Sequence, residues 1–250
     1  MRVMAIGAHP DDVEFMCAGT LFLLKRQENF EFQVTTLTAG DCGSVEHPPD
    51  EIADIRRGEA REAAGMLDAD YSCLEEKDCR IFTGSELLET VVEQMRRFAP
   101  HVVFTHYPED YMVDHEETSR IVRSATFTAP IPNFSTGADD PAQAMDHIPH
   151  LYYWAPMEGK NIFGKQVESG FYVDIGGVIE QKKQMLACHA SQREWLLKQH
   201  GVDEYINAMV ETAHKTGLLA SVPYAEGFTQ HRGHAYPAHN VLKEYLEVIE

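Results

Sequence analysis

The sequence lacks the features that mark membrane, repeat and low-complexity proteins. Its first apolar run, Val3 to Ile6, is too short for a membrane span or for the apolar region of a signal peptide. It contains no internal repeat and no compositionally biased segment. We therefore expect a folded protein with no membrane partner.

Cysteine is scarce and does not form a recognisable framework. The five cysteines include no CxxC pair, and their odd number argues against a set of disulfides. A reducing, cytoplasmic location is the expectation that follows. The cysteines are Cys17, Cys42, Cys73, Cys79 and Cys188.

Basic charge is also in short supply. The chain has 40 acidic and 21 basic residues, which gives a formal net charge of −19. A basic stripe is the usual footprint of nucleic-acid binding, and none is present, so we expect no nucleic-acid partner. The acidic excess mainly favours solubility.

The 250 residues, 44% of them hydrophobic, are enough for one sizeable α/β domain spanning residues 1–250. Strands alternate with helices in the predicted pattern, which indicates a mostly parallel sheet with helices on both faces. Four prolines in residues 129–150 predict a long loop or lid there. Expected strands cover residues 3–7, 32–37, 71–74, 101–105, 151–154 and 171–175. Expected helices cover residues 13–27, 51–67, 116–126, 178–189 and 204–217, and one more follows a capping-box pattern at Thr83 and Glu86 and ends near Phe98.

Polar residues gather where the predicted strands end. The first strand leads into His9-Pro10-Asp11-Asp12, and the strand at 101–105 is followed within ten residues by Asp114 and His115. Sites in parallel sheets form beyond the carboxyl ends of the strands. His9 and Asp12 can bind one ion in a tight turn, and His115 is the candidate third ligand. This ligand set suits zinc and is also found around iron(II). The alternative is that an aspartate of the turn simply caps the following helix.

The segment AHPDDVE, followed by Cys17-Ala18-Gly19-Thr20, resembles the signature of the PIG-L (LmbE-like) deacetylase family. The similarity extends along nearly the whole chain, through residues 55–67, 110–115, 171–175, 182–192 and 226–228. It implies a Rossmann-like fold, one zinc ion and a homo-oligomer. It also implies a small-molecule substrate: the expected reaction removes an acetyl group from an N-acetylglucosamine-type conjugate or a similar small amide.

The same resemblance implies roles for individual residues. The metal ligands would be His9, Asp12 and His115, the catalytic base Asp11, and the sugar contacts Arg56 and Asp78. Arg56 has a second reading, a surface pair with Glu59 on its helix. Asp114 is expected to assist catalysis by hydrogen bonding to the ring of His115 or of a neighbouring residue. It could also cap the helix from Glu116 onward.

One position departs from the family pattern. Met112 stands where the pattern Asp-x-His-x-Asp-His has a histidine that stabilises the oxyanion or supplies a proton, and a thioether does neither well. Met112 would therefore line the substrate pocket without that role, which Tyr111 or a C-terminal histidine could take over. The candidate histidines are His231, His234 and His239, and the favoured alternative for each one is an ordinary place in a polar C-terminal loop.

Met112 also motivates an alternative function, a non-catalytic or weakly active member of the family that binds metal or sugar. A nucleotide-binding protein is disfavoured, because AHPDD in place of GxGxxG would set carboxylates against the phosphates.

Overall fold

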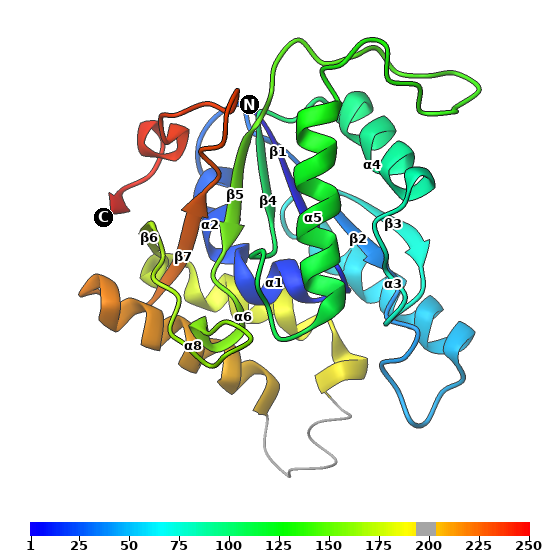
Figure 1. Ribbon diagram of the computed structural model, residues 1–250. Coiled ribbons are helices and arrows are strands. Elements are labelled where there is room, and N and C mark those ends of the chain that lie inside the picture. Colours follow the sequence, from blue (N-terminus) through cyan, green and yellow to red (C-terminus); the bar gives the residue numbers. More distant parts are fainter. Residues whose placement is uncertain (194–203) are drawn as a thin grey trace.

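The computed structural model describes residues 1–193 and 204–250, and the strands within them form one sheet in the order β3-β2-β1-β4-β5-β7-β6-β8 (Figure 1). The strands are β1 (Arg2–Gly7), β2 (Glu31–Thr38), β3 (Asp70–Glu76), β4 (Val102–Thr105), β5 (His150–Trp154), β6 (Phe171–Asp174), β7 (Ala225–Gln230) and β8 (Val248–Ile249). The helices are α1 (Asp12–Met16), α2 (Ala18–Lys25), α3 (Pro49–Gly65), α4 (Ser85–Phe98), α5 (Val113–Thr128), α6 (Ile179–Ala187) and α8 (Glu204–Ala220), with short 3₁₀ turns at Met157–Gly159, Gly176–Val178 and Val241–Glu244.

Strands β1 to β5 are mutually parallel, and β7, β6 and β8 extend the sheet in antiparallel pairs. From β1 the chain runs outward through β2 and β3, then returns to place β4 on the other side of β1. The carboxyl ends of β1 and β4 therefore lie at a topological switch point, the usual place for a ligand site in such sheets.

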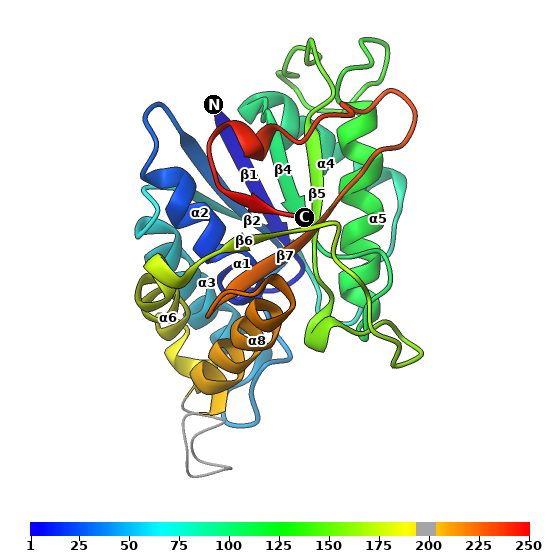
Figure 2. The same ribbon diagram turned by 90° about the vertical axis from the view of Figure 1, so that its left-hand side faces the viewer.

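Helices cover both faces of the sheet (Figure 2). Successive residues of β1 point to opposite faces, because the side-chain repeat of a strand is two residues. Val3 and Ala5 pack in the core beneath α1, α2, α3, α6 and α8. Met4 and Ile6 pack in the core beneath α4 and α5. The predicted Rossmann-like, single-sheet fold with helices on both faces is thereby confirmed.

Two local predictions were wrong, and two strands were missed. The helix expected over 13–27 is broken at the fully buried Cys17 into α1 and α2. The capping box does not form: Gly84 occupies the N-cap of α4, while Thr83 donates to Glu117 from its amide (2.9 Å) and its hydroxyl (2.7 Å). Strands β7 and β8 were not anticipated, although β7 joins the antiparallel strands to β5.

The proline-rich segment 129–150 has no helix or strand before β5 begins. It lies at the end of the sheet where β1 starts, away from the carboxyl ends of β1 and β4 (Figure 1). It contributes nothing to the lining of the cavity at those ends, so it is a loop and not a lid over that cavity. In the described ranges, no helix combines the length and apolar character needed to cross a bilayer.

Candidate metal centre

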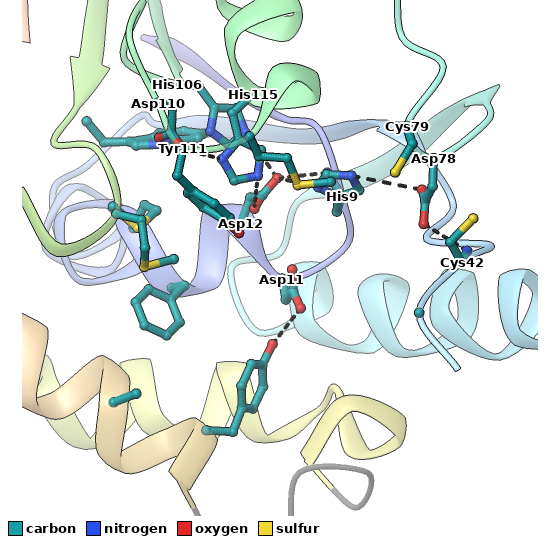
Figure 3. Close-up of a pocket in the computed structure, with 18 of the residues that line it drawn as sticks. His9, Asp11, Asp12, Cys42, Asp78, Cys79, His106, Asp110, Tyr111 and His115 are labelled. Carbon is teal, nitrogen blue, oxygen red and sulfur yellow. Dashed lines mark hydrogen bonds and ion pairs between the residues drawn. The ribbon is translucent and has the colours of Figure 1, made fainter. Parts of the chain in front are cut away.

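A cavity of about 550 Å³ opens at the carboxyl ends of β1 and β4 (Figure 3). The sequence-predicted site residues all line it except Asp114, which lies buried directly behind His9. The predicted residues on its wall are His9, Asp11, Asp12, Arg56, Asp78, Met112 and His115.

The turn from β1 into α1 is folded around Asp12. The amide of His9 donates to Asp12 Oδ2 (2.7 Å), which closes the turn. Asp11 sits at the N-cap of α1 with φ of 105°, a left-handed conformation that is uncommon for a non-glycine residue. Its side chain makes no capping hydrogen bond, so the capping alternative is wrong for Asp11. Unfavourable backbone geometry of this kind persists where the surroundings require it, often at functional sites.

His9, Asp12 and His115 converge as the sequence predicted. One ligand atom from each lies within 4.8 Å of the others. His9 Nδ1 is 3.6 Å from Asp12 Oδ2, and His115 Nε2 is 3.5 Å from Asp12 Oδ1. These three groups could hold one divalent cation.

Each of the two rings is oriented by a carboxylate on its other nitrogen. His9 Nε2 lies 3.2 Å from Asp114 Oδ2, and His115 Nδ1 lies 2.9 Å from Asp110 Oδ1. This leaves one nitrogen of each ring facing Asp12, the pattern in which outer carboxylates orient metal-binding histidines. Asp114 therefore holds a neighbour's ring and not that of His115. It does not cap α5 either, since the N-cap is Met112.

The charges around the rings favour a cation. Burial disfavours the charged form of His9, but the carboxylates of Asp114 and Asp12 outweigh it and raise the pKa of His9 to about 10. Burial would raise the pKa of Asp12, but His115 and His106 hold it well below its usual range. Two imidazoles and one carboxylate, close together and buried, form a donor set that fits a divalent cation.

His106, which follows β4 directly, is a cavity residue that was not predicted from the sequence. Its Nε2 accepts from the amide of Ala8 (3.0 Å) and lies 3.0 Å from Asp12 Oδ2. Its ring stacks on His115 with centroids 4.0 Å apart. Burial and the charge of His115 lower the pKa of His106 to about 4.

His106 also belongs to a second candidate donor set, with Asp110 and His115. In that set Nε2 of His106 is already engaged by Ala8, and Nδ1 of His115 by Asp110. In the set of His9, Asp12 and His115, the ring nitrogens that face Asp12 remain available to a cation, because the carboxylates of Asp114 and Asp110 bind the other nitrogens. This set is therefore the better cation site.

Asp11 projects into the cavity beside these rings. Its Oδ2 accepts from Arg56 Nη2 (3.1 Å) and from the hydroxyl of Tyr205 (2.6 Å). Burial raises the pKa of the Asp11 carboxyl, with Arg56 and Tyr205 acting in the opposite direction. Tyr205 was not foreseen, because it lies 194 positions along the chain from Asp11.

Arg56 is a buried residue of α3 whose guanidinium is held by backbone oxygens. Its Nη2 donates to Pro10 O (2.5 Å) and its Nη1 to Gly40 O (3.5 Å). A Cβ at Gly40 would collide with this guanidinium, and Gly40 has φ of 76°, so glycine is required there. Glu59 is bonded to Ser191 instead, and the surface pair of Arg56 with Glu59 does not form.

Asp78 brings a free acceptor to the cavity. Its Oδ2 accepts from the amide of Cys42 (2.9 Å), while Oδ1 is buried and has no hydrogen bond within residues 1–193 and 204–250. Oδ1 lies 4.0 Å from His9 Nε2. An orphaned buried acceptor of this kind suits a ligand hydroxyl.

The residues proposed to take over the role of the family histidine at position 112 lie in different places. Tyr111 lines the cavity and meets His115 edge-on, with centroids 5.4 Å apart. The three C-terminal histidines do not line it, and His231 instead bonds the hydroxyl of Tyr153 (3.0 Å). These three histidines therefore fit the alternative of an ordinary place in the C-terminal loop, and Tyr111 is the candidate that lies in the cavity.

A buried ion pair fastens the antiparallel part of the sheet to the helices near the cavity. Lys182 of α6 pairs with Glu226 of β7, each side chain 2% exposed. Glu226 also accepts from the amides of Gly19 (2.8 Å) and Thr20 (2.7 Å) at the start of α2. The contacts join three elements that are distant in sequence.

Comparison with known proteins places this site in a family. The family model PIG-L, described as GlcNAc-PI de-N-acetylase, matches residues 4–126. Mycothiol S-conjugate amidase of Streptomyces coelicolor is 28% identical over 167 residues, which are 55% of this chain and 57% of that protein. The alignment thus spans little more than half of the relative's length.

Two solved structures share the fold over nearly the whole chain. N,N'-diacetylchitobiose deacetylase from Pyrococcus horikoshii superimposes with a TM-score of 0.78 at 22% identity, covering 95% of this chain and 87% of that one. The 4-carboxy-2-hydroxymuconate hydratase of Pseudomonas putida KT2440 has a TM-score of 0.75 at 19% identity, covering 96% and 99%. The residues matched by the family model include every site residue predicted from the sequence, and the chain belongs to the PIG-L (LmbE-like) family.

Proposed function

We propose that the chain is a zinc-dependent amidohydrolase that removes an acetyl group from an N-acetylglucosamine-type conjugate or a similar small amide. The observation that carries the proposal is the convergence of His9, Asp12 and His115, with Asp11 beside them, on one cavity. Its volume of about 550 Å³ is in the range of small-molecule sites. The amidase and deacetylase activities of the relatives support this reaction class.

In this proposal Asp11 moves the proton. A zinc ion held by the three side chains would supply a Lewis acid for the amide carbonyl and a lowered pKa for nearby water. Asp11 accepts a proton from the attacking water while the oxygen of that water bonds to the carbonyl carbon of the amide. The carboxyl then gives the proton to the amine as the C–N bond breaks, and the products are the free amine and acetic acid, which ionises to acetate by losing a proton to water. Burial raises the pKa of Asp11, which suits a group that must both accept and return a proton.

Asp78 and Arg56 are the proposed substrate contacts. The unpaired Oδ1 of Asp78 can accept from a sugar hydroxyl. The terminal nitrogens of Arg56 already donate to Pro10, Gly40 and Asp11. Any contact of Arg56 with a substrate would therefore be additional to these hydrogen bonds. Met112 contributes an apolar part of the wall.

The decisive test joins metal content to turnover. The purified protein is assayed by elemental analysis, which separates zinc from iron, and by amine release from a panel of N-acetyl amino sugars. The rate of amine release from an acetamide without a sugar ring is compared with these rates, because such a substrate lacks the hydroxyl that Asp78 is proposed to bind. Zinc near one equivalent together with amine release would support the proposal. Amine release that persists unchanged after removal of the metal would contradict it.

Met112 supports a second candidate, a non-catalytic or weakly active protein that binds metal or sugar. A zinc-loaded preparation that binds an N-acetyl amino sugar but releases no amine would favour it. Because a hydratase shares the fold, water addition to an unsaturated carboxylic acid belongs in the same panel as a separate outcome.

A further inference from the structure

Among residues 1–193 and 204–250, the hydrogen-bond donors to the Asp11 side chain meet only one of its oxygens, Oδ2. Arg56 Nη2 and the Tyr205 hydroxyl both donate to Oδ2, at 3.1 Å and 2.6 Å. Of the two donors, the tyrosine makes the shorter bond. A hydrogen bond from a neutral hydroxyl to a carboxylate is charge-assisted and therefore among the stronger kinds in proteins.

The two donors come from different parts of the molecule. Arg56 lies on α3 and is fixed by backbone oxygens of the β1 and β2 turns. Tyr205 lies in the first turn of α8, and its ring packs at 6.5 Å from that of Phe15 on α1. Burial raises the pKa of Tyr205 well above its usual value, so the phenol keeps its proton and remains a donor. The carboxylate is thus held from two sides.

We infer that Tyr205 is a positioning residue for the catalytic base: with Arg56 it fixes Oδ2 of Asp11 and leaves Oδ1 as the oxygen that handles the proton. The inference rests on the proposed function, since it concerns the base of that reaction. A carboxylate free to rotate about its side-chain bonds would present either oxygen at variable distances. Fixing one oxygen selects the other, and displacements of about 1 Å in a reacting group cost roughly 100-fold in rate.

The left-handed backbone of Asp11 fits this role. Its φ is 105°, and its carboxylate makes no capping hydrogen bond to the helix that it precedes. Without donors from outside the turn, the side chain would have no fixed orientation. Tyr205 and Arg56 supply those donors.

The first test is kinetic. Tyr205→Phe removes only the hydroxyl, and we expect kcat on the best N-acetyl substrate to fall about 10- to 100-fold with KM and zinc content unchanged. The matched control is Tyr71→Phe, which removes another partly buried hydroxyl, bonded to Thr36 at 2.8 Å and outside the cavity. That variant should keep the parental kcat.

A double-mutant cycle with Asp11→Asn separates positioning from general damage. If Tyr205 acts through Asp11, adding Tyr205→Phe to Asp11→Asn should lower the residual rate no further. Equal fold-losses in both backgrounds would overturn the inference.

The same cycle is measured by denaturant unfolding of the purified chain, with no substrate present. Non-additive shifts of the unfolding midpoint would establish the contact itself, even if the proposed reaction were wrong. Additive shifts would mean that Tyr205 and Asp11 are not coupled, and the inference would fail on its own.

Discussion

The parallel and antiparallel parts of the sheet serve the cavity differently. The parallel strands β1 and β4 deliver His9, Asp12 and His106 directly from their carboxyl ends. The antiparallel strands deliver no candidate metal ligand among the described residues, and their part of the chain reaches the site through α8, which carries Tyr205. The comparison teaches that strand topology places the candidate ligands His9 and Asp12, whereas the orientation of the Asp11 carboxylate, the proposed base, depends on helix α8.

The largest expected effect is on the parallel side. His115→Ala removes one of three candidate ligands, and we expect the purified variant to lose its zinc and its turnover. Elemental analysis and amine release measure both. His106→Gln is the matched control, because glutamine can still accept from the amide of Ala8. Zinc lost from both variants would favour the second donor set, which contains His106 as well as His115.

The next effect separates binding from chemistry within one turn. Asp11→Asn keeps the shape of the side chain but cannot accept the proton, so we expect a loss of about 100- to 10,000-fold in kcat with zinc retained. Steady-state kinetics and elemental analysis on the same preparation check this. Parental turnover in the variant would exclude Asp11 as the base.

The buried ion pair tests how the antiparallel part is attached. Lys182→Met leaves Glu226 charged and unpaired, although the amides of Gly19 and Thr20 still donate to it. We expect a loss of about 3–5 kcal/mol in unfolding free energy, measured by denaturant titration.

The adjacent Lys183→Met is its control, since Lys183 pairs with Glu180 at 3.0 Å on the surface. That change should cost no more than about 1 kcal/mol. Equal losses of unfolding free energy in the two variants would show that the buried Lys182 pair stabilises the fold no more than the surface pair does.

A smaller effect is expected from the carboxylate that orients His9. Asp114→Asn weakens the bond to His9 Nε2, which is 3.2 Å long, without removing a ligand. We expect zinc affinity to fall roughly 10- to 100-fold, measured by competition with a chelator. Unchanged affinity would mean that the turn around Asp12 fixes the ring of His9 by itself.

The fold and the three converging residues were predictable because strand topology places them. An apolar strand followed by polar residues indicates a site at the carboxyl end of that strand. His9, Asp12 and His115 satisfy that rule. His106 satisfies it too, since it follows β4 directly, and it could have been found by the same reasoning.

Other features had no local signal. Strand β7 contains Glu226 and Gly227, residues that are uncommon in strands, and only tertiary pairing with β5 and β6 stabilises it. Tyr205 lies in an ordinary helical pattern, and nothing near it in sequence indicates its bond to Asp11. The capping box at Thr83 failed because Glu117, distant in sequence, accepts from the amide of Thr83, which is the donor that Glu86 would take in a capping box.

The smallest expected effect is at Met112, where the chain departs from its family. Met112 is the N-cap of α5 with extended backbone and lines the cavity, so histidine fits there without strain. Met112→His should leave amine release from N-acetyl amino sugars unchanged or raise it by less than about tenfold, which is ~1.4 kcal/mol. Val113→His, one residue further and 59% exposed, is the control for an added histidine outside the cavity. A large loss confined to Met112→His would mean that the thioether shapes a pocket for a different substrate, because the added imidazole would then be blocking a contact rather than supplying a donor.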